Sequence, residues 1–196
     1  MGKLKIGVFG LWRGMEYVRQ FHAHPDTEIC AVCDSDEKRV AEAAGHCGNQ
    51  IRTYKTYDEL LESGIDAVVL CNYFNEHAPA AIKAMERGID VLSECTAGST
   101  LRECVELVEA VERTGRKYML AENYPFSRPM REITNLVKGG TLGRILYAEG
   151  EYNHTATRED LIALTPGKTH WRAYMPRTYY CTHALGPLMY ATGEMP

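Results

Sequence analysis

Over residues 1–122, short apolar runs alternate with segments of helical periodicity, and this alternation restricts the fold more than any other property of the chain. Five apolar runs are typical of buried strands: KIGVFG, TEICAVCD, IDAVVLCNY, IDVLSE and KYMLAENY. Most of the segments between them repeat apolar residues at helical spacing, which predicts amphipathic helices. Strands that alternate with helices form a parallel sheet with right-handed crossovers. We therefore expect an α/β fold with a doubly wound parallel sheet.

The predicted helices of this region carry boundary signals. One helix, STLRECVELVEAVERTG, has Ser99 and Thr100 at its start, Glu103 near its first turn and Gly115 just past its end. Side-chain oxygens at a helix start satisfy free N–H groups, and glycine adopts the left-handed conformation that ends a helix. The other predicted helices are GMEYVRQFHA, EKRVAEAAG, TYDELLES and HAPAAIKAMERG, the last ending at Gly88.

The regular alternation stops after Asn123. Three segments of regular structure are expected there: a helix over PFSRPMREITNLVKGG, a long strand over GRILYAEGEYNHT and a short apolar helix within YYCTHALGPLMYATG. Residues 155–178 are rich in Pro, Gly and Thr and are expected to be irregular. We therefore divide the chain into domains 1–122 and 123–196, the second being the beginning of an α+β domain. A single strand has unpaired edges that favour association, so we expect a homo-oligomer.

Composition excludes several classes of protein. The chain is 45% hydrophobic and 24% charged, which is typical of a globular protein, and its net charge is −4. The chain has no cluster of Lys and Arg residues of the kind that binds nucleic acid. No apolar run approaches the roughly 20 residues that span a membrane. The first ten residues, MGKLKIGVFG, lead directly into a strand and lack the layout of a signal peptide, so a cytoplasmic location is expected.

The seven cysteines are scattered and odd in number, which indicates reduced thiols. Cys30 and Cys33 form a C-x-x-C motif within a predicted strand. Residues three apart in a strand point to opposite faces, and no second Cys/His pair follows. We therefore predict no metal site.

The loop after the first strand, GVFGLWRG, is a candidate phosphate cradle. Backbone N–H groups at a helix start bind anions, and small residues let a pyrophosphate approach. The match to G-x-G-x-x-G is imperfect, because counting from Gly10 places Trp12 and Met15 at the second and third glycine positions, with Gly14 one place early. An ordinary strand–helix turn is the alternative reading.

Asp34 ends the second strand, 24 residues after Gly10. An acidic residue at this place can hold both ribose hydroxyls of NAD, and its charge disfavours the extra phosphate of NADP. A solvated surface aspartate is the alternative. The combination of strand, loop, helix, strand and acid predicts NAD binding.

The other strand ends carry polar side chains that can surround a dinucleotide, because ligands of open α/β sheets gather at the carboxyl ends of the strands. These candidates are Asn72, Asn75, His77, Glu94, Cys95 and Asn123. His77 also begins a helix, where a neutral imidazole can act simply as a cap. The predicted role of each residue rests on its place at a strand end.

Two long stretches resemble the glucose–fructose oxidoreductase, inositol dehydrogenase and rhizopine-catabolism (Gfo/Idh/MocA) family: DAVVLCNYFNEHAPAAIKAMERGIDVLSE and STLRECVELVEAVERTGRKYMLAENYPF. The resemblance covers nearly the whole chain. It implies a Rossmann domain that binds NAD, followed by a second domain for substrate binding and dimerisation. It also implies hydride transfer on a sugar or polyol. Members of the family are considerably longer than this chain.

The sequence departs from the family pattern at two catalytic places. The fourth strand of the family normally ends in Glu-Lys-Pro, whereas this chain has Glu94, Cys95 and Thr96. The family's Asp-x-x-x-His is represented by Tyr179 and His183. A thiol cannot replace a cationic hydrogen-bond donor, so ordinary alcohol dehydrogenation is in question. Cys95 is then a small filler beside the nicotinamide or, with a base and a lowered pKa, a nucleophile.

The NAD-dependent glycosidase branch, known for α-N-acetylgalactosaminidase, is similar in four segments: AENYPF, EGEYNH, THWR and YYCTHALGP. This branch also lacks the lysine. The resemblance implies that NAD⁺ takes hydride from C3 of the sugar, which acidifies the C2 proton. A base then removes that proton, the glycosidic bond breaks by elimination, water adds, and the hydride returns.

The resemblance to this branch also assigns residues. It implies catalytic roles for Tyr180 and His183, and substrate contacts for Tyr152 and Tyr124. It implies cofactor contacts for four further residues: Trp12, Arg13, Trp171 and Arg172. Histidine suits proton transfer because its ordinary pKa lies near 6.5. Packing under the following helix is the alternative role for Tyr179 and Tyr180.

Three functions follow from these assignments. The first is an NAD(H)-dependent oxidoreductase acting by hydride transfer on a sugar or polyol. The second is an NAD-dependent glycosidase that works by oxidation, elimination and reduction. The third is a nucleotide-binding or sensing protein without catalysis, since the lysine and the aspartate are absent. Net NADH production, sugar release without net NADH, and NAD binding without turnover distinguish them.

Overall fold

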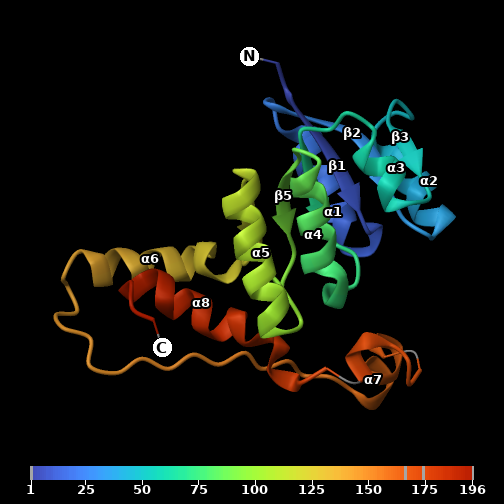
Figure 1. Ribbon diagram of the computed structural model, residues 1–196. Coiled ribbons are helices and arrows are strands. Elements are labelled where there is room, and N and C mark those ends of the chain that lie inside the picture. The colour runs from blue at the N-terminus through green and yellow to red at the C-terminus, as the bar shows by residue number, and fades with distance from the viewer. Residues whose placement is uncertain (1, 166, 174, 196) are drawn as a thin grey trace. The chain divides into compact units, whose positions relative to one another are not determined.

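The computed structural model describes residues 2–165, 167–173 and 175–195. The chain divides into two compact units, Met1–Ala121 and Glu122–Pro196, which are described separately (Figure 1). The functional roles of the two parts stay predictions.

A six-stranded parallel sheet forms the centre of the first unit. Its strands are β1 (Leu4–Phe9), β2 (Thr27–Cys33), β3 (Arg52–Tyr54), β4 (Ala67–Leu70), β5 (Asp90–Ser93) and β6 (Tyr118–Leu120). The order β3-β2-β1-β4-β5-β6 is that of a doubly wound sheet, which confirms the predicted Rossmann fold class. Sequence analysis missed β3, because it contains only three residues and none of them is buried.

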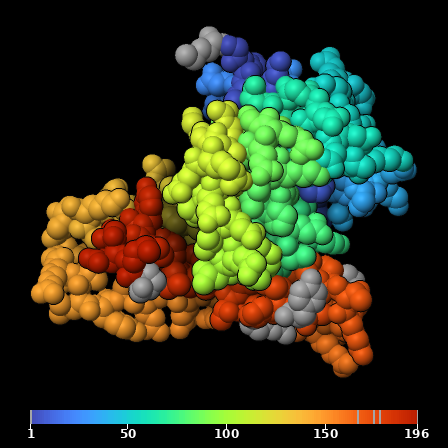
Figure 2. All heavy atoms as spheres, in the orientation of Figure 1, coloured from blue at the N-terminus to red at the C-terminus, as the bar shows by residue number. Residues whose placement is uncertain are grey.

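Helices cover both faces of this sheet. They are α1 (Leu11–Ala23), α2 (Glu37–His46), α3 (Tyr57–Leu61), α4 (His77–Glu86) and α5 (Leu101–Thr114), with a 3₁₀ turn, η1, at Phe74–Glu76. One core cluster takes apolar residues from α1 and α2, and the other takes them from α3, α4 and α5. Figure 2 shows α4 and α5 packed together as one surface of this unit. The boundary signals of α5 are confirmed, since Thr100 and Glu103 form a capping box and Gly115 is left-handed, with φ 66°.

A bulge in β2 changes the expected placement of the C-x-x-C motif. Ile6 pairs with Ile29 but Gly7 pairs with Ala31, so Cys30 is the extra residue. Cys30 therefore packs against the same core cluster as Cys33, and the expectation of opposite faces was wrong. Burial raises the pKa of both thiols, that of Cys33 to about 11, so both are protonated, unreactive packing groups at neutral pH.

The second unit is helical. It contains η2 (Tyr124–Phe126), α6 (Arg128–Lys138), α7 (Arg158–Leu164), η3 (Trp171–Ala173), η4 (Arg177–Tyr180) and α8 (Cys181–Thr192). Helices α6 and α8 pack against each other (Figure 1). The predicted helices of this region are confirmed, whereas α7 forms where irregular structure was expected. Its Thr157 and Asp160 make a capping box that the sequence analysis overlooked.

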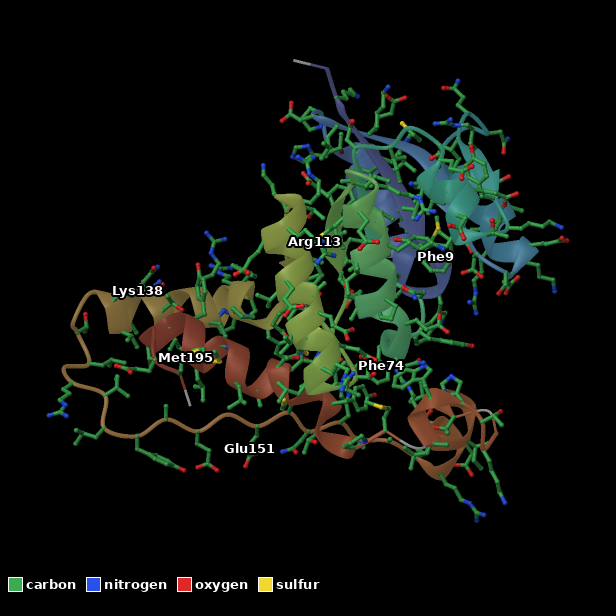
Figure 3. The ribbon with its side chains drawn as sticks, viewed as in Figure 1. Phe9, Phe74, Arg113, Lys138, Glu151 and Met195 are labelled. Atoms are coloured by element: carbon green, nitrogen blue, oxygen red, sulfur yellow. The ribbon has the colours of Figure 1, made fainter. Side chains whose placement is uncertain are left out.

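The predicted strand GRILYAEGEYNHT does not form. Residues 144–157 run as an extended segment with no assigned strand, and Glu151 lies on it (Figure 3). A strand requires a neighbour for its backbone N–H and C=O groups, and the described residues of this unit contain no other strand. Apolar side chains of the segment remain exposed, 84% for Leu146 and 78% for Tyr147. No helix among the described residues has the length and apolar character to cross a membrane.

Candidate functional site

The carboxyl ends of the parallel strands in the first unit lie along one edge of the sheet, and the strand order reverses there between β1 and β4. Strand β1 has β2 on one side and β4 on the other, so the helices that follow β1 and β4 lie on opposite faces. A crevice is expected at such a switch point, which is the usual ligand site of an open α/β sheet. Phe9 at the end of β1 and Phe74 in the turn after β4 mark this region (Figure 3).

Gly10 cannot be replaced in its present backbone conformation. Its φ is 85°, and a Cβ atom there would lie 2.5 Å from the carbonyl carbon and oxygen of Cys71 and 2.6 Å from the nitrogen of Asn72. Gly14 has a related role, since a Cβ there would lie 2.8 Å from Val8 Cγ1. Gly14 therefore permits the close helix–strand packing that the third glycine of the dinucleotide motif provides, although it stands one place early.

Asp34 holds the start of α1 in place. Its Oδ2 accepts a hydrogen bond from Leu11 N at 2.6 Å, and its Oδ1 accepts one from Asp36 N at 2.8 Å. Gly10, the N-cap residue of α1, has no side chain that could satisfy a helical N–H group. Asp34 thus links the second strand to the candidate phosphate loop. Its assignment to the ribose stays a prediction.

Glu94 joins the end of β5 to α1. Its Oε1 accepts hydrogen bonds from Arg13 Nε and Tyr17 O–H, each at 2.8 Å, and its Oε2 accepts one from Cys95 N at 3.2 Å. The hydrogen bond to Glu94 raises the pKa of the Arg13 guanidinium above its ordinary value. Trp12, next to Arg13, is 67% exposed. The structure therefore brings Arg13 and Glu94 together as a fixed pair and leaves the Trp12 ring open to solvent.

Asn72 and Asn75 carry buried polar atoms without partners among the described residues. These atoms are Nδ2 and Oδ1 of Asn72 and Oδ1 of Asn75. An unpaired buried amide costs about 1–3 kcal/mol, so such groups usually have a ligand or water as partner. Both residues follow β4, close to the Gly10 turn. Together with that turn, they fit the dinucleotide predicted for this edge of the sheet.

His77 is a buried link between two loops. It is 1% exposed, with Nδ1 at 2.9 Å from the carbonyl oxygen of Thr96 and Nε2 at 3.2 Å from that of Asn72. A neutral imidazole has one N–H group and can donate to only one of these oxygens. Any effect of His77 on a cofactor would therefore pass through the two loops that it joins. Its predicted cofactor role stays a prediction.

The first unit is expected to lose stability as the pH falls below about 6.5. Burial lowers the His77 pKa from its ordinary 6.5, while the two carbonyl contacts and Glu94 oppose the shift. Between the folded and the unfolded pKa of His77, the unfolded chain binds a proton at this histidine and the folded chain does not. The free energy of unfolding therefore falls as the pH falls through this range. Urea unfolding of wild type and His77→Gln at about pH 7.5 and about pH 5 measures this loss. The variant should lose less stability than wild type, whereas exposed His46→Gln should match wild type. Equal losses in all three proteins would contradict the assignment.

Cys95 lies below the surface at the end of β5, with 7% exposure. The peptide bond between Cys95 and Thr96 is cis. Nearby Cys71 has its pKa raised well above the ordinary value by burial, and the charge of Glu94 adds to the shift. Cys71 therefore stays a thiol at neutral pH. The role of Cys95 as a filler at the family's lysine position stays a prediction.

His183 is paired with a carboxylate in the second unit. Its Nδ1 lies 2.8 Å from both carboxylate oxygens of Glu122, and the two side chains are 10% and 11% exposed. Burial raises the Glu122 pKa, but hydrogen bonds led by the one from His183 outweigh burial and hold that pKa below its ordinary value. The ionised Glu122 accepts the Nδ1 hydrogen, so Nε2 is the ring atom that can accept a proton.

Three tyrosines surround the His183 ring. Tyr124 and Tyr180 stack on it, with centroid distances of 4.5 Å and 5.0 Å, and Tyr152 is tilted at 4.7 Å. The Tyr152 hydroxyl also hydrogen-bonds His154 Nε2. The structure therefore brings together all four residues that were predicted for catalysis and substrate binding.

The remaining candidates of the second unit are Asn123, Trp171 and Arg172. The Tyr179 ring contacts both Tyr180, at 4.3 Å, and Trp171, at 5.4 Å. Arg172 lies 4.6 Å above the Trp171 ring as a cation–π pair. Asn123 is exposed. The cofactor roles of Asn123, Trp171 and Arg172 stay predictions.

Sequence reasoning missed two residues of these clusters, Glu122 and Tyr17. Glu122 stands at a strand end that was recognised, but its partner lies 61 residues away. Tyr17 was treated only as part of a helix, and its partner Glu94 lies 77 residues away. The position of Glu122, two residues after the end of β6, was the one signal that could have indicated it.

A model of the oxidoreductase family with an NAD-binding Rossmann fold (GFO_IDH_MocA) matches residues 4–122. Similar curated proteins include a glycosyl hydrolase family 109 protein of Shewanella sp. (strain W3-18-1), 30% identical over 201 residues. An alpha-N-acetylgalactosaminidase of Shewanella oneidensis is also 30% identical over 201 residues. In both cases the match covers 96% of this chain and 44% of the relative, so the chain spans less than half of these proteins.

Solved structures share the fold. A putative myo-inositol dehydrogenase from Sinorhizobium meliloti 1021 is similar with a TM-score of 0.79 and 19% identity, over 99% of this chain and 56% of that one. Scyllo-inositol dehydrogenase from Lactobacillus casei, solved with NAD(H) and scyllo-inositol, gives a TM-score of 0.69 and 20% identity, over 73% and 43%. The matched residues include all six strands of the parallel sheet and the turn at Gly10. The chain belongs to the Gfo/Idh/MocA oxidoreductase family, whose members have an NAD-binding Rossmann fold.

Proposed function

We propose that the protein containing this chain is an NAD(H)-dependent oxidoreductase that acts on a sugar or polyol by hydride transfer. The observation that carries the proposal is the Glu122–His183 pair enclosed by Tyr124, Tyr152 and Tyr180. Phenol hydroxyls and aromatic faces suit a polyhydroxylated substrate. Two similar structures, myo-inositol 2-dehydrogenase and scyllo-inositol dehydrogenase, carry polyol names that support this substrate class.

In this proposal the first unit binds the cofactor. The Gly10 turn and the N–H groups at the start of α1 would receive the pyrophosphate, and Asp34 would bind the ribose hydroxyls. Asn72 and Asn75 would satisfy their unpaired amide atoms on the ligand. When bound, NAD⁺ supplies the hydride acceptor.

The second unit supplies the groups that handle protons. Glu122 holds the Nδ1–H of His183, which fixes the tautomer and leaves Nε2 to accept a proton from a substrate hydroxyl or C–H group. Ionised Glu122 also stabilises the imidazolium that forms. Tyr152 and Tyr180 would hydrogen-bond substrate hydroxyls or the oxygen that becomes a ketone.

A second candidate function is an NAD-dependent glycosidase. It is favoured by Cys95, which stands where a dehydrogenase of this family has lysine, and by the names of the curated relatives. The elimination route needs a base for a C–H proton, for which His183 is again suited. The hydride returns at the end of this cycle, so no NADH accumulates.

We expect the chain to bind NADH reversibly and to prefer it over NADPH. NADH absorbs where tryptophan emits, so bound NADH should quench Trp12 fluorescence by energy transfer. The chain has two tryptophans, Trp12 and Trp171, and the quench is recorded on the unaltered chain. A saturable quench with NADH, weaker with NADPH, supports the proposal. No quench and no thermal shift with NAD⁺ or NADH would overturn it.

Turnover assays then separate the candidates. The protein is incubated with NAD⁺ and a panel of inositols, aldoses and aryl N-acetylhexosaminides, while NADH and released aglycone are recorded together. Net NADH production selects the dehydrogenase, and aglycone release without net NADH selects the glycosidase. NADH binding without turnover on the whole panel would leave a nucleotide-binding protein without catalysis.

The proposal includes a cytoplasmic location and self-association. All seven cysteines are free, which suits a reducing compartment. The exposed side chains of Leu146 and Tyr147 on an unpaired extended segment favour a second copy as partner. Light scattering coupled to size-exclusion chromatography tests the association, and a monomer at all concentrations would contradict it.

A further inference from the structure

One carboxylate oxygen in the first unit collects two donors from a single helix. Glu94 Oε1 accepts both Arg13 Nε–H and Tyr17 O–H, each at 2.8 Å. Arg13 and Tyr17 are four residues apart on α1 and therefore share one face of that helix. The Glu94 side chain is 17% exposed and the Arg13 side chain 48%, so the carboxylate is largely buried while the guanidinium is open to solvent. The three side chains join the first turn of α1 to the carboxyl end of β5.

Arg13 uses one nitrogen in this cluster. The guanidinium has five N–H donors, and its two Nη groups make no hydrogen bond or ion pair with the part of the chain that the structure describes. Arg13 lies in the first turn of α1, which contains no acidic residue. A cation at a helix start opposes the helix dipole, whereas an anion bound there is favoured. Two free Nη groups at this place match a phosphate, which accepts charge-assisted N–H bonds.

Tyr17 keeps its proton in this environment. Burial raises its pKa above the ordinary value, and the charge of Glu94 raises it further. The phenol is therefore a permanent donor to Glu94 at neutral pH. Without this second donor, Glu94 would keep only Arg13 Nε–H and the longer contact from Cys95 N, at 3.2 Å, so its carboxylate would hold Arg13 in a less fixed geometry.

We propose that Tyr17 is a positioning residue of the dinucleotide site, which holds Glu94 so that Glu94 holds Arg13 with both Nη groups preset for the cofactor pyrophosphate. This inference rests on the proposed NAD(H) binding. Tyr17 acts through Glu94 and Arg13 and does not itself contact the cofactor. Preorganised charges bind better because their ordering cost is met during folding.

A double-mutant cycle on NADH affinity tests the proposal. Tyr17→Phe removes one hydroxyl and should weaken NADH binding by about 3–10-fold, which is less than the loss of a direct hydrogen bond to a charged group would cause, because Tyr17 acts only through Glu94 and Arg13. Arg13→Met should weaken binding by at least as much. If Tyr17 acts through Arg13, the variant with both changes should bind no more weakly than Arg13→Met. Glu94→Gln removes the charge that holds Arg13 and should also weaken binding, which keeps a test available if Tyr17→Phe does not fold.

The matched control is Tyr57→Phe. Tyr57 O–H donates to the carbonyl oxygen of Ala80 at 2.9 Å in the same unit, so its loss affects stability but should leave NADH affinity at the wild-type value. Wild-type affinity in Tyr17→Phe would overturn the proposal, as would a full further loss when it is added to Arg13→Met. If the wild-type chain itself binds no NADH, the dinucleotide proposal fails, which is a separate result.

Discussion

Gly10→Ala is expected to lower the free energy of unfolding of the first unit by about 3 kcal/mol and to abolish NADH binding. The backbone at Gly10 has φ 85°, which L side chains rarely adopt. In addition, the new Cβ would lie 2.5 Å from the Cys71 carbonyl group, and a backbone neighbour cannot move aside as a flexible side chain can. The turn must therefore open, and it carries the N–H groups proposed to bind the pyrophosphate. Urea unfolding and NADH titration measure the two effects.

Gly48→Ala is the matched control for this substitution. Gly48 also has positive φ, 67°, but a Cβ there meets nothing within 4 Å. We expect a loss of about 1 kcal/mol from the backbone conformation and no change in NADH affinity. Equal losses of stability in the two variants would show that the close approach to Cys71 has no energetic weight. NADH binding by Gly10→Ala at the wild-type affinity would exclude this turn as the phosphate site.

His183→Gln is expected to lower turnover by about 10²–10⁴-fold, the range for a general base. Glutamine keeps a polar group in the aromatic cluster but cannot exchange a proton at neutral pH. NADH affinity should stay near the wild-type value, because the proposed cofactor contacts of the Gly10 turn and Asp34 belong to the other unit. The measurement is kcat on the substrate that the panel identifies, with NADH titration beside it.

Glu122→Gln distinguishes positioning from catalysis at this pair. The amide can still accept a hydrogen bond from His183 but brings no negative charge, so kcat should fall by less than in His183→Gln. Exposed His46→Gln in the first unit should leave kcat unchanged. Turnover of His183→Gln at the wild-type rate would remove His183 from the reaction, and a loss of NADH binding in that variant would assign His183 to the cofactor instead.

The pairing of His183 with Glu122 bears on the two residues that this chain lacks relative to its family. The resemblance to the family predicts that Cys95 stands at the lysine position and Tyr179 at the aspartate position of Asp-x-x-x-His. The carboxylate on His183 Nδ1 gives the histidine an orienting group and a counter-charge from elsewhere in the chain. The proton transfer proposed for His183 therefore does not depend on those two family residues.

The order of the elements was predictable where local signals were strong. Strand β4 is an uninterrupted apolar run, AVVL, and the capping box of Thr100 and Glu103 marks the start of α5. By contrast, β3 has no apolar pattern, since it is a three-residue edge strand. The segment 144–157 has the composition of a strand, but strand formation depends on a partner that lies elsewhere in sequence.

The alternation of apolar runs and amphipathic helices was enough to determine the doubly wound sheet, because each signal lies within one local stretch of chain. Gly10 and Asp34 were recognisable for the same reason, as residues at strand ends. The partners of these residues were decided by tertiary structure: Asp34 with Leu11 N, Tyr17 with Glu94, and Glu122 with His183. A hydrogen bond requires two atoms to meet within about 3 Å at a suitable angle. For residues 23, 77 and 61 positions apart, that meeting depends on how the strands and helices pack, which local sequence does not encode.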